Sequence, residues 1–193
     1  MRMEGNDILD KAIIFATNAH SGSFRKGTNL PYIVHPMEVA SIVSTMTDDR
    51  SVMAAAMLHD TVEDTNTTID DIRREFGDKV ADLVSSESEN KREDLPSGDT
   101  WKIRKQETVD RLKNESSKEA KMIALGDKLS NMRAIWRDYA TIGDKLWERF
   151  NQSDPHEILW YYGAVAESLA DLGDTFAYKE YVELINEMRS LIK

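Results

Sequence analysis

The chain has 193 residues, with 25 Lys or Arg against 35 Asp or Glu, so its formal net charge is −10. Apolar residues make up 40% and charged residues 31%, which is typical of a globular protein rather than a disordered one. The absence of cysteine excludes a disulfide scaffold and a thiolate metal site. The acidic balance argues against nucleic acid as a partner, and no stretch has the length of a membrane span. The first residues do not resemble an export signal, so we expect a cytoplasmic protein.

Helical periodicity accounts for nearly the whole first half of the chain. Asn6 or Asp7 can cap the first predicted helix, and Asp48 or Asp49 the third. The middle of the third helix, residues 52–58, is apolar on every side, which is typical of a helix in the centre of a domain. The predicted helices run over residues 8–20, from 36, over 50–64 and from 68 to Gly77, where Thr68 begins a capping box.

The second half of the chain is also predicted to be helical. Residues 85–99 are polar and contain Pro96 and Gly98, which indicates a long, mobile surface loop. The further predicted helices run over about 100–114, 117–139 and 155–172, and from 175 to the C-terminus. We therefore expect an all-α fold in which residues 1–193 form a single domain, interrupted but not divided by the loop.

The chemistry concentrates where the most apolar helix ends. His59 and Glu63 would share one face of a continuous helix, and Asp60 and Asp64 the adjacent face. So much negative charge beside an apolar run is costly unless a cation is present, which favours a metal site. The alternative is a chance His-Asp dipeptide followed by a solvated helix end.

Two other segments can supply further ligands. His35 lies between Pro31 and Pro36 just before a predicted helix start, which gives it a rigid position. Asp127 lies inside an otherwise apolar helical stretch, where a carboxylate is expensive without a partner. The alternatives are a helix-entry histidine for His35, and a buried pair with Lys128 or Arg133 for Asp127.

Taken together, His35, His59, Asp60 and Asp127 would form a mixed set of imidazoles and carboxylates. Such a set suits Mn²⁺, Mg²⁺ or iron rather than structural zinc. Four protein ligands around an octahedral ion leave two positions, for water and for a phosphate oxygen.

Three segments resemble, in order along the chain, the motifs of the HD-domain phosphohydrolases, and among them the alarmone (ppGpp) hydrolases. The most specific is residues 57–65, Met-Leu-His-Asp-Thr-Val-Glu-Asp-Thr, because few other HD proteins carry Glu-Asp at this offset. The resemblance extends over most of the chain, through Arg25-Lys26, Pro31-Tyr32, His35-Pro36, residues 68–77, Trp101, Arg104-Lys105 and residues 125–133.

The resemblance implies an all-helical fold that holds one Mn²⁺ through His35, His59, Asp60 and Asp127, with Mg²⁺ or iron as alternatives. It also implies hydrolysis of the 3′-pyrophosphate of ppGpp or pppGpp to GDP or GTP plus pyrophosphate. The chain is too short for the synthetase and regulatory domains of the bifunctional relatives, so we expect it only to degrade the alarmone.

The family pattern also assigns roles around the metal. Glu63 would orient or deprotonate the attacking water, and Asp64 would assist it or hold the metal's outer shell. Arg25 and Lys26 would bind the nucleotide, although a solvated loop pair is the alternative. Asn131 matches a residue near the ribose, and Tyr161 matches an aromatic that contacts the nucleotide or, alternatively, serves ordinary helix packing.

Two departures from the family pattern concern the substrate. The loop formed by residues 27–30 is one residue longer, and Ala134 stands where many relatives carry a polar side chain facing the base. Alternative functions are therefore hydrolysis of an adenine alarmone or NADPH, or a non-catalytic nucleotide-binding protein. Oligomeric state, metal identity and a lid role for the 85–99 loop are not decided by the sequence.

Overall fold

The computed structural model describes residues 7–87, 92 and 96–192, and these residues form helices and connecting turns. Within them no strand is present beyond one isolated bridge, between Phe24 and Pro31. No helix in these ranges combines the length and the hydrophobicity that crossing a bilayer requires. The predicted all-α class is confirmed. The chain divides into two compact units, Met1–Ser88 with Met122–Asp127, and Glu89–Lys121 with Lys128–Lys193.

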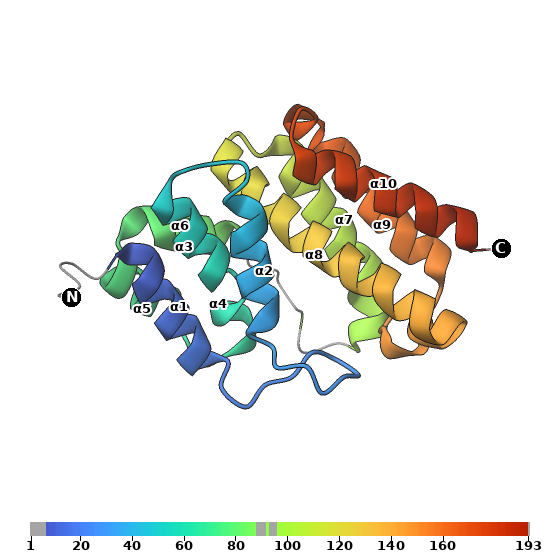
Figure 1. Ribbon diagram of the computed structural model, residues 1–193, viewed down its shortest axis with the longest axis horizontal. Coiled ribbons are helices and arrows are strands. Elements are labelled where there is room, and N and C mark those ends of the chain that lie inside the picture. The colour runs from blue at the N-terminus through green and yellow to red at the C-terminus, as the bar shows by residue number, and fades with distance from the viewer. Residues whose placement is uncertain (1–6, 88–91, 93–95, 193) are drawn as a thin grey trace. The chain divides into compact units, whose positions relative to one another are not determined.

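The first unit is built around one apolar helix, α3. Its helices are α1 (Ile8–Ala19), α2 (Val34–Val43), α3 (Arg50–Leu58), α4 (Thr61–Asp64), α5 (Ile69–Phe76) and α6 (Asp78–Glu87). Helix α3 packs against α1, α2 and α6 (Figure 1). Its run of three alanines, residues 54–56, is fully buried. Small side chains let the neighbouring helices approach closely, which explains why this helix is apolar on every side.

Several predicted caps are present in the first unit. The Asp7 side chain accepts a hydrogen bond from the Leu9 N–H, at 3.0 Å. Thr68 and Asp71 form a reciprocal capping box, and Gly77 ends α5 with φ of 84°. That left-handed conformation favours glycine because a Cβ would be strained there.

The second unit centres on α9. Its helices are α7 (Ser97–Asn114), most of α8 (Lys118–Ile142), η1 (Gly143–Arg149), α9 (Pro155–Ser168), η2 (Ala170–Leu172) and α10 (Phe176–Leu191). Helix α9 packs against α7 and α10. At Gly163 a Cβ would lie 2.1 Å from Nη2 of Arg189, so glycine is what lets the Arg189 guanidinium lie across α9.

Several boundaries and two elements differ from the prediction. Helix α3 ends at Leu58 rather than continuing to residue 64, and α2 begins two residues before Pro36. Pro36 is tolerated inside the first turn because N–H groups there have no intrahelical partner. Helices α6 and η1 are additional.

The predicted 85–99 loop is wrong at both ends. Residues 85–87 complete α6, where the Ser86 hydroxyl donates to the Leu83 carbonyl at 2.7 Å, and residues 97–99 begin α7. Apart from Arg92 and Pro96, the rest of that segment lies outside the described residues. A lid role therefore stays a prediction.

Asp49 links the start of α3 to α6, and its charge makes this link dependent on pH. Its carboxylate accepts a hydrogen bond from the Ser51 N–H at 2.8 Å and from Lys79 Nζ at 2.6 Å. The hydrogen bond from Lys79, and then that from Ser51, hold the pKa of Asp49 below its ordinary value. A lowered folded-state pKa means that the stabilisation is present above the unfolded value of about 3.9 and is lost as the pH falls further.

We therefore expect Asp49→Ala to lower the free energy of unfolding at pH 7 by about 1 kcal/mol, the typical value of an N-cap. The difference from the parent chain should shrink below about pH 4. Denaturant unfolding at several pH values measures this. Asp49→Asn, which keeps a cap but cannot titrate, is the control. A difference that stays constant from pH 7 to below pH 4 would contradict the assignment.

Candidate metal centre

Three buried side chains of the first unit form a group that can hold a metal ion. His35 lies on α2, His59 directly follows α3, and Asp127 lies on α8. Each offers one nitrogen or oxygen atom, and these atoms all lie within 4.8 Å of one another. Only 3%, 3% and 7% of their respective surfaces are exposed. Residues far apart in the sequence therefore meet at one point.

Asp60 joins this group. Its Oδ2 lies 3.1 Å from Nε2 of His59 and 3.5 Å from Nε2 of His35. Asp127 Oδ1 lies 3.1 Å from Nε2 of His35 and 3.8 Å from Nε2 of His59. Each imidazole nitrogen thus faces both carboxylates. All four residues named as ligands from the sequence are together, and their donor atoms suit a divalent cation of the Mn²⁺, Mg²⁺ or Fe²⁺ type.

The tautomer of His59 leaves its other nitrogen available as a ligand. Its Nδ1 lies 2.8 Å from the Ala56 carbonyl oxygen, which can only accept, so Nδ1 carries the hydrogen. Nε2 is buried and has no hydrogen-bond partner within the described residues. A buried nitrogen without a partner is costly, and a cation between it and the carboxylates would remove that cost. The residues therefore fit a bound metal ion.

The break between α3 and α4 sets the positions of His59 and Asp60. The Thr61 hydroxyl donates to the Leu58 carbonyl at 2.6 Å and competes with the backbone hydrogen bonds of a continuous helix. Asp60, with φ of −93° and ψ of −6°, occupies the position before the first residue of α4 without a capping hydrogen bond from its side chain. The continuous helix predicted over residues 50–64 is therefore interrupted at His59 and Asp60, but the Asp64 N–H still donates to the Asp60 carbonyl at 2.9 Å, so Asp60 and Asp64 lie on one side as predicted.

Gly126 brings α8 close to α2. A Cβ on this residue would lie 3.0 Å and 3.2 Å from side-chain atoms of Val43 and Val39, respectively, and 3.3 Å from the Val39 carbonyl oxygen. Any larger residue would have to push these neighbours aside. The glycine therefore allows the next residue, Asp127, to reach His35.

The charges of the centre compensate one another. Burial would raise the pKa of Asp60, but the charge of His59, and then the charge of His35, hold it well below its ordinary range. Burial would lower the pKa of His59, but Asp60 and Asp127 raise it well above its ordinary value. Without a metal ion, a proton on His59 offsets the charge of the carboxylates, so a cation and this proton compete for the same place.

Tyr32, which precedes α2, connects the two carboxylates at the rim of the centre. Its hydroxyl lies 2.6 Å from Asp60 Oδ2 and 2.8 Å from Asp64 Oδ2. Burial, followed by the charges of the two carboxylates, raises the pKa of Tyr32 far above its ordinary value, so the hydroxyl remains a donor. Asp64 is exposed and Glu63 half-buried, both on α4. Their predicted catalytic roles stay predictions.

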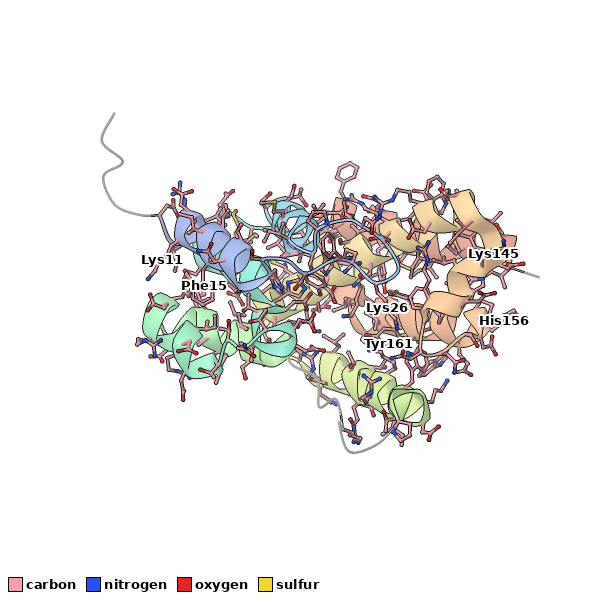
Figure 2. All side chains as sticks on the ribbon, turned by 90° about the horizontal axis from the view of Figure 1, so that it is seen from below. Lys11, Phe15, Lys26, Lys145, His156 and Tyr161 are labelled. Carbon is pink, nitrogen blue, oxygen red and sulfur yellow. The ribbon has the colours of Figure 1, made fainter. Side chains whose placement is uncertain are left out.

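Arg25 and Lys26 lie in the turn between α1 and α2. The Arg25 N–H donates to the Leu30 carbonyl at 2.9 Å, and Gly27 has φ of 72°, which closes the turn. The Arg25 guanidinium carbon lies 5.7 Å from the centre of the Tyr32 ring. Lys26, labelled in Figure 2, is exposed to solvent. Of the two predicted nucleotide-binding cations, Arg25 is thus linked to the carboxylates through Tyr32.

Asn131 and Tyr161 belong to the second unit. Asn131 is half-buried on α8. Tyr161, on α9 (Figure 2), is 4% exposed and packs edge-on against Trp101 of α7, with ring centres 6.2 Å apart. Lys105 Nζ lies 5.1 Å from the Tyr161 ring centre. Helix packing therefore accounts for the ring, while the predicted contacts of Asn131 and Tyr161 with a nucleotide stay predictions.

Two residues at the centre had no role in the sequence-based picture, Tyr32 and His20. His20 follows α1, is 3% exposed, and its ring stacks on that of Tyr32. Tyr32 lies inside the motif that contains His35, and this position in the sequence could have indicated that it belongs to the centre. For His20 the sequence offers only its place five residues before Arg25.

Comparison with known proteins gives the family. The chain belongs to the HD-domain family, whose model, described as HD domain, matches residues 12–152. It is 37% identical over 133 residues to the guanosine-3′,5′-bis(diphosphate) 3′-pyrophosphohydrolase MESH1 of Xenopus tropicalis, which covers 67% of this chain and 70% of that protein. It is also 35% identical over 130 residues to the GTP pyrophosphokinase rsh of Brucella ovis, covering 66% of this chain and 17% of the relative. The chain thus spans about a sixth of the length of this larger relative.

Solved structures agree with this family. One is described as a metazoan ortholog of SpoT that hydrolyses ppGpp and plays a role in starvation responses. It superposes on this chain with a TM-score of 0.76 at 25% sequence identity. The match covers 99% of this chain and 100% of that one. Another is lmo0812 of Listeria monocytogenes, with a TM-score of 0.69 at 31% identity over 83% of this chain and 99% of the other. The predicted resemblance to HD-domain proteins is confirmed.

If this group holds a divalent ion, the ion should stabilise the folded chain. With Mn²⁺ at about 100 times its Kd, linkage predicts a gain of about 2.7 kcal/mol, or a rise in Tm of about 5–10 °C for a chain of this size. Asp127→Asn, which removes one charge at nearly constant volume, should abolish the rise. Thermal unfolding after EDTA treatment, with and without added Mn²⁺, measures it. In Asp10→Asn, which changes an exposed carboxylate on α1, the rise should persist. An equal rise in Asp127→Asn and the parent chain would contradict the site.

Proposed function

We propose that this protein hydrolyses the 3′-pyrophosphate of ppGpp or pppGpp, releasing pyrophosphate and GDP or GTP. The observation that carries the proposal is the buried group of two imidazoles and two carboxylates in an HD-domain chain. The names of the relatives from Xenopus tropicalis and Aquifex aeolicus, both guanosine-3′,5′-bis(diphosphate) 3′-pyrophosphohydrolases, support the substrate.

In this proposal His35, His59, Asp60 and Asp127 hold one Mn²⁺ ion. A bound divalent ion supplies a positive charge that lowers the pKa of a neighbouring water and offsets the charge on the phosphate. The burial of these ligands favours tight binding of the ion, because carboxylates in a medium of low dielectric constant interact strongly with a cation. Without the ion, the same carboxylates would repel a polyanionic substrate.

Glu63 is the proposed general base. It takes a proton from the attacking water, whose oxygen bonds to the phosphorus attached to the 3′ oxygen. The bond between that phosphorus and the 3′ oxygen breaks, pyrophosphate is released, and the 3′ oxygen takes up a proton. Asp64 lies next to Glu63 on α4, and its hydrogen bond from Tyr32 supports a role in holding the water or the outer shell of the metal.

Arg25 and Lys26 are the proposed nucleotide-binding cations of this unit. A guanidinium can stack on a base, and the exposed ammonium of Lys26 can face a phosphate. Asn131 and Tyr161 are proposed to contact the ribose and the nucleotide. The small side chain of Ala134 offers no hydrogen bond to a base, which is the reason for testing other nucleotides alongside ppGpp.

The direct test is product analysis. With Mn²⁺ and ppGpp, we expect equal amounts of GDP and pyrophosphate, measured by anion-exchange chromatography, and no reaction after EDTA treatment. NADPH and an adenine alarmone are incubated in parallel. Turnover of one of these with none of ppGpp would replace the proposed substrate. Absence of turnover on all three would favour a nucleotide-binding role instead.

Glu63→Gln tests the base. Glutamine has nearly the same shape but cannot accept the proton, so kcat should fall by about 100-fold or more. Mn²⁺ affinity, measured by calorimetry, should stay within about twofold because Glu63 is not a proposed ligand. Asp10→Asn, remote from the centre, should leave kcat unchanged. A Glu63→Gln variant with full activity would exclude this residue as the base.

Lys26→Ala tests the nucleotide-binding role. Loss of a charge-assisted contact of about 1.5 kcal/mol should raise KM for ppGpp about tenfold and leave Mn²⁺ affinity unaltered. Lys118→Ala, at the first residue of α8, removes an exposed lysine of equal charge and serves as control. An unchanged KM in Lys26→Ala would favour the alternative reading of a solvated loop residue.

A further inference from the structure

The phenol of Tyr32 contacts groups on several sides of the metal centre. Its hydroxyl lies within hydrogen-bond distance of Asp60 and Asp64, at 2.6 Å and 2.8 Å. Its ring meets the His35 ring edge-on, with ring centres 6.0 Å apart, and the Arg25 guanidinium carbon lies 5.7 Å from the ring centre. One side chain thus links a proposed ligand, a proposed catalytic carboxylate and a proposed nucleotide-binding cation.

A phenol carries one hydrogen, but two carboxylate oxygens lie against this one. The hydroxyl can therefore donate to only one carboxylate at a time, while its position holds both close together. Asp64 is exposed, and its Oδ2 is the second carboxylate oxygen that this hydroxyl contacts. Removing the hydroxyl would take away the group that holds the Oδ2 atoms of Asp60 and Asp64 close together.

His20 holds the opposite side of Tyr32. The two rings are stacked with centres 4.7 Å apart and an angle of 27° between their planes. His20 is buried at the end of α1, where its N–H donates to the Ala16 carbonyl at 3.0 Å, so the backbone holds it firmly. Neither ring nitrogen has a hydrogen-bond partner among the described residues. The imidazole therefore contributes a flat surface rather than a hydrogen bond.

We infer that Tyr32 is a positioning residue that orients Asp60 and Asp64, and that His20 is the ring that fixes Tyr32 in place. This inference rests on the proposed function only in giving Asp60 the role of ligand and Asp64 a role next to the attacking water. The hydroxyl of Tyr32 acts on the metal through Asp60, and His20 acts through Tyr32.

The first test is Tyr32→Phe, which deletes the hydroxyl and keeps the ring that faces His20 and Arg25. Loss of such an outer-shell hydrogen bond typically costs 10–100-fold in metal affinity or activity. We expect the Kd for Mn²⁺, measured by isothermal titration calorimetry, to rise at least tenfold. We expect kcat on ppGpp at saturating Mn²⁺ to fall about as much, with KM within about twofold of the parent value. An Mn²⁺ affinity within twofold of the parent chain would overturn the inference.

The second test separates the flat ring from the ring nitrogens of His20. His20→Phe keeps a flat ring, so its Mn²⁺ affinity should stay within about twofold of the parent chain. His20→Ala should lose about as much affinity as Tyr32→Phe. Because His20 acts through the hydroxyl, adding His20→Ala to Tyr32→Phe should cause no further loss. If His20→Phe binds Mn²⁺ as weakly as Tyr32→Phe does, the flat-surface role is wrong.

A matched control distinguishes positioning from general loosening of α1. Phe15, labelled on α1 in Figure 2, packs edge-on against Phe76 of α5, with ring centres 5.4 Å apart. Phe15→Ala should lower Tm and leave Mn²⁺ affinity unchanged. A loss of Mn²⁺ affinity equal to that of His20→Ala would overturn the role of His20.

Calorimetry needs no turnover, so it separates this inference from the proposed function. A chain that binds Mn²⁺ through a Tyr32-dependent centre but leaves ppGpp intact would refute the proposed substrate and uphold the inference.

Discussion

The structure of the first unit is organised around the cost of placing carboxylates and imidazoles in an apolar interior. Asp127 follows Gly126, where α8 approaches α2, the helix that carries His35, and His59 and Asp60 follow α3, whose alanines are fully buried. Moving such groups out of water costs free energy, and this cost is offset only if the groups neutralise one another or bind a cation. The arrangement therefore favours an ion-binding role over a purely structural one.

Small residues make this gathering of charge sterically feasible. The alanines of α3 allow α1, α2 and α6 to surround that helix, and Gly126 allows α8 to approach Val39 and Val43 of α2. The hydroxyls of Thr61 and Tyr32 then set the finer geometry, one by ending α3 and the other by joining two carboxylates. Packing thus determines which groups meet, and hydrogen bonds determine how they face one another.

Much of this could be predicted from the sequence, because the relevant signals are local. Periodicity and caps identified most helices, and the apolar run followed by His59 and Asp60 marked the centre. The helix end at Leu58 could not be predicted, because the residue type of Thr61 does not reveal whether its hydroxyl bonds the Leu58 carbonyl; that depends on the folded backbone. The end of α6 is polar, and the buried residues of this helix lie before it, so the sequence there predicts a loop rather than a helix.

The stacking of His20 on Tyr32 was also beyond the sequence, because the two residues lie on either side of a turn and meet only after it closes. Similarly, nothing in the triplet formed by Trp160, Tyr161 and Tyr162 indicates which ring will be buried. Contacts across the fold, rather than local propensity, decide such details.

The backbone of the centre has ordinary conformations, so backbone strain does not contribute to the free-energy cost of the site. Among the described residues, left-handed φ values occur at Arg92 and at Gly22, Gly27, Gly77 and Gly143. His59 and Asp60 both have right-handed helical angles. The free-energy cost of gathering these side chains is therefore electrostatic rather than conformational. Protons and cations therefore act on this cost directly, through the charges of His59, Asp60 and Asp127.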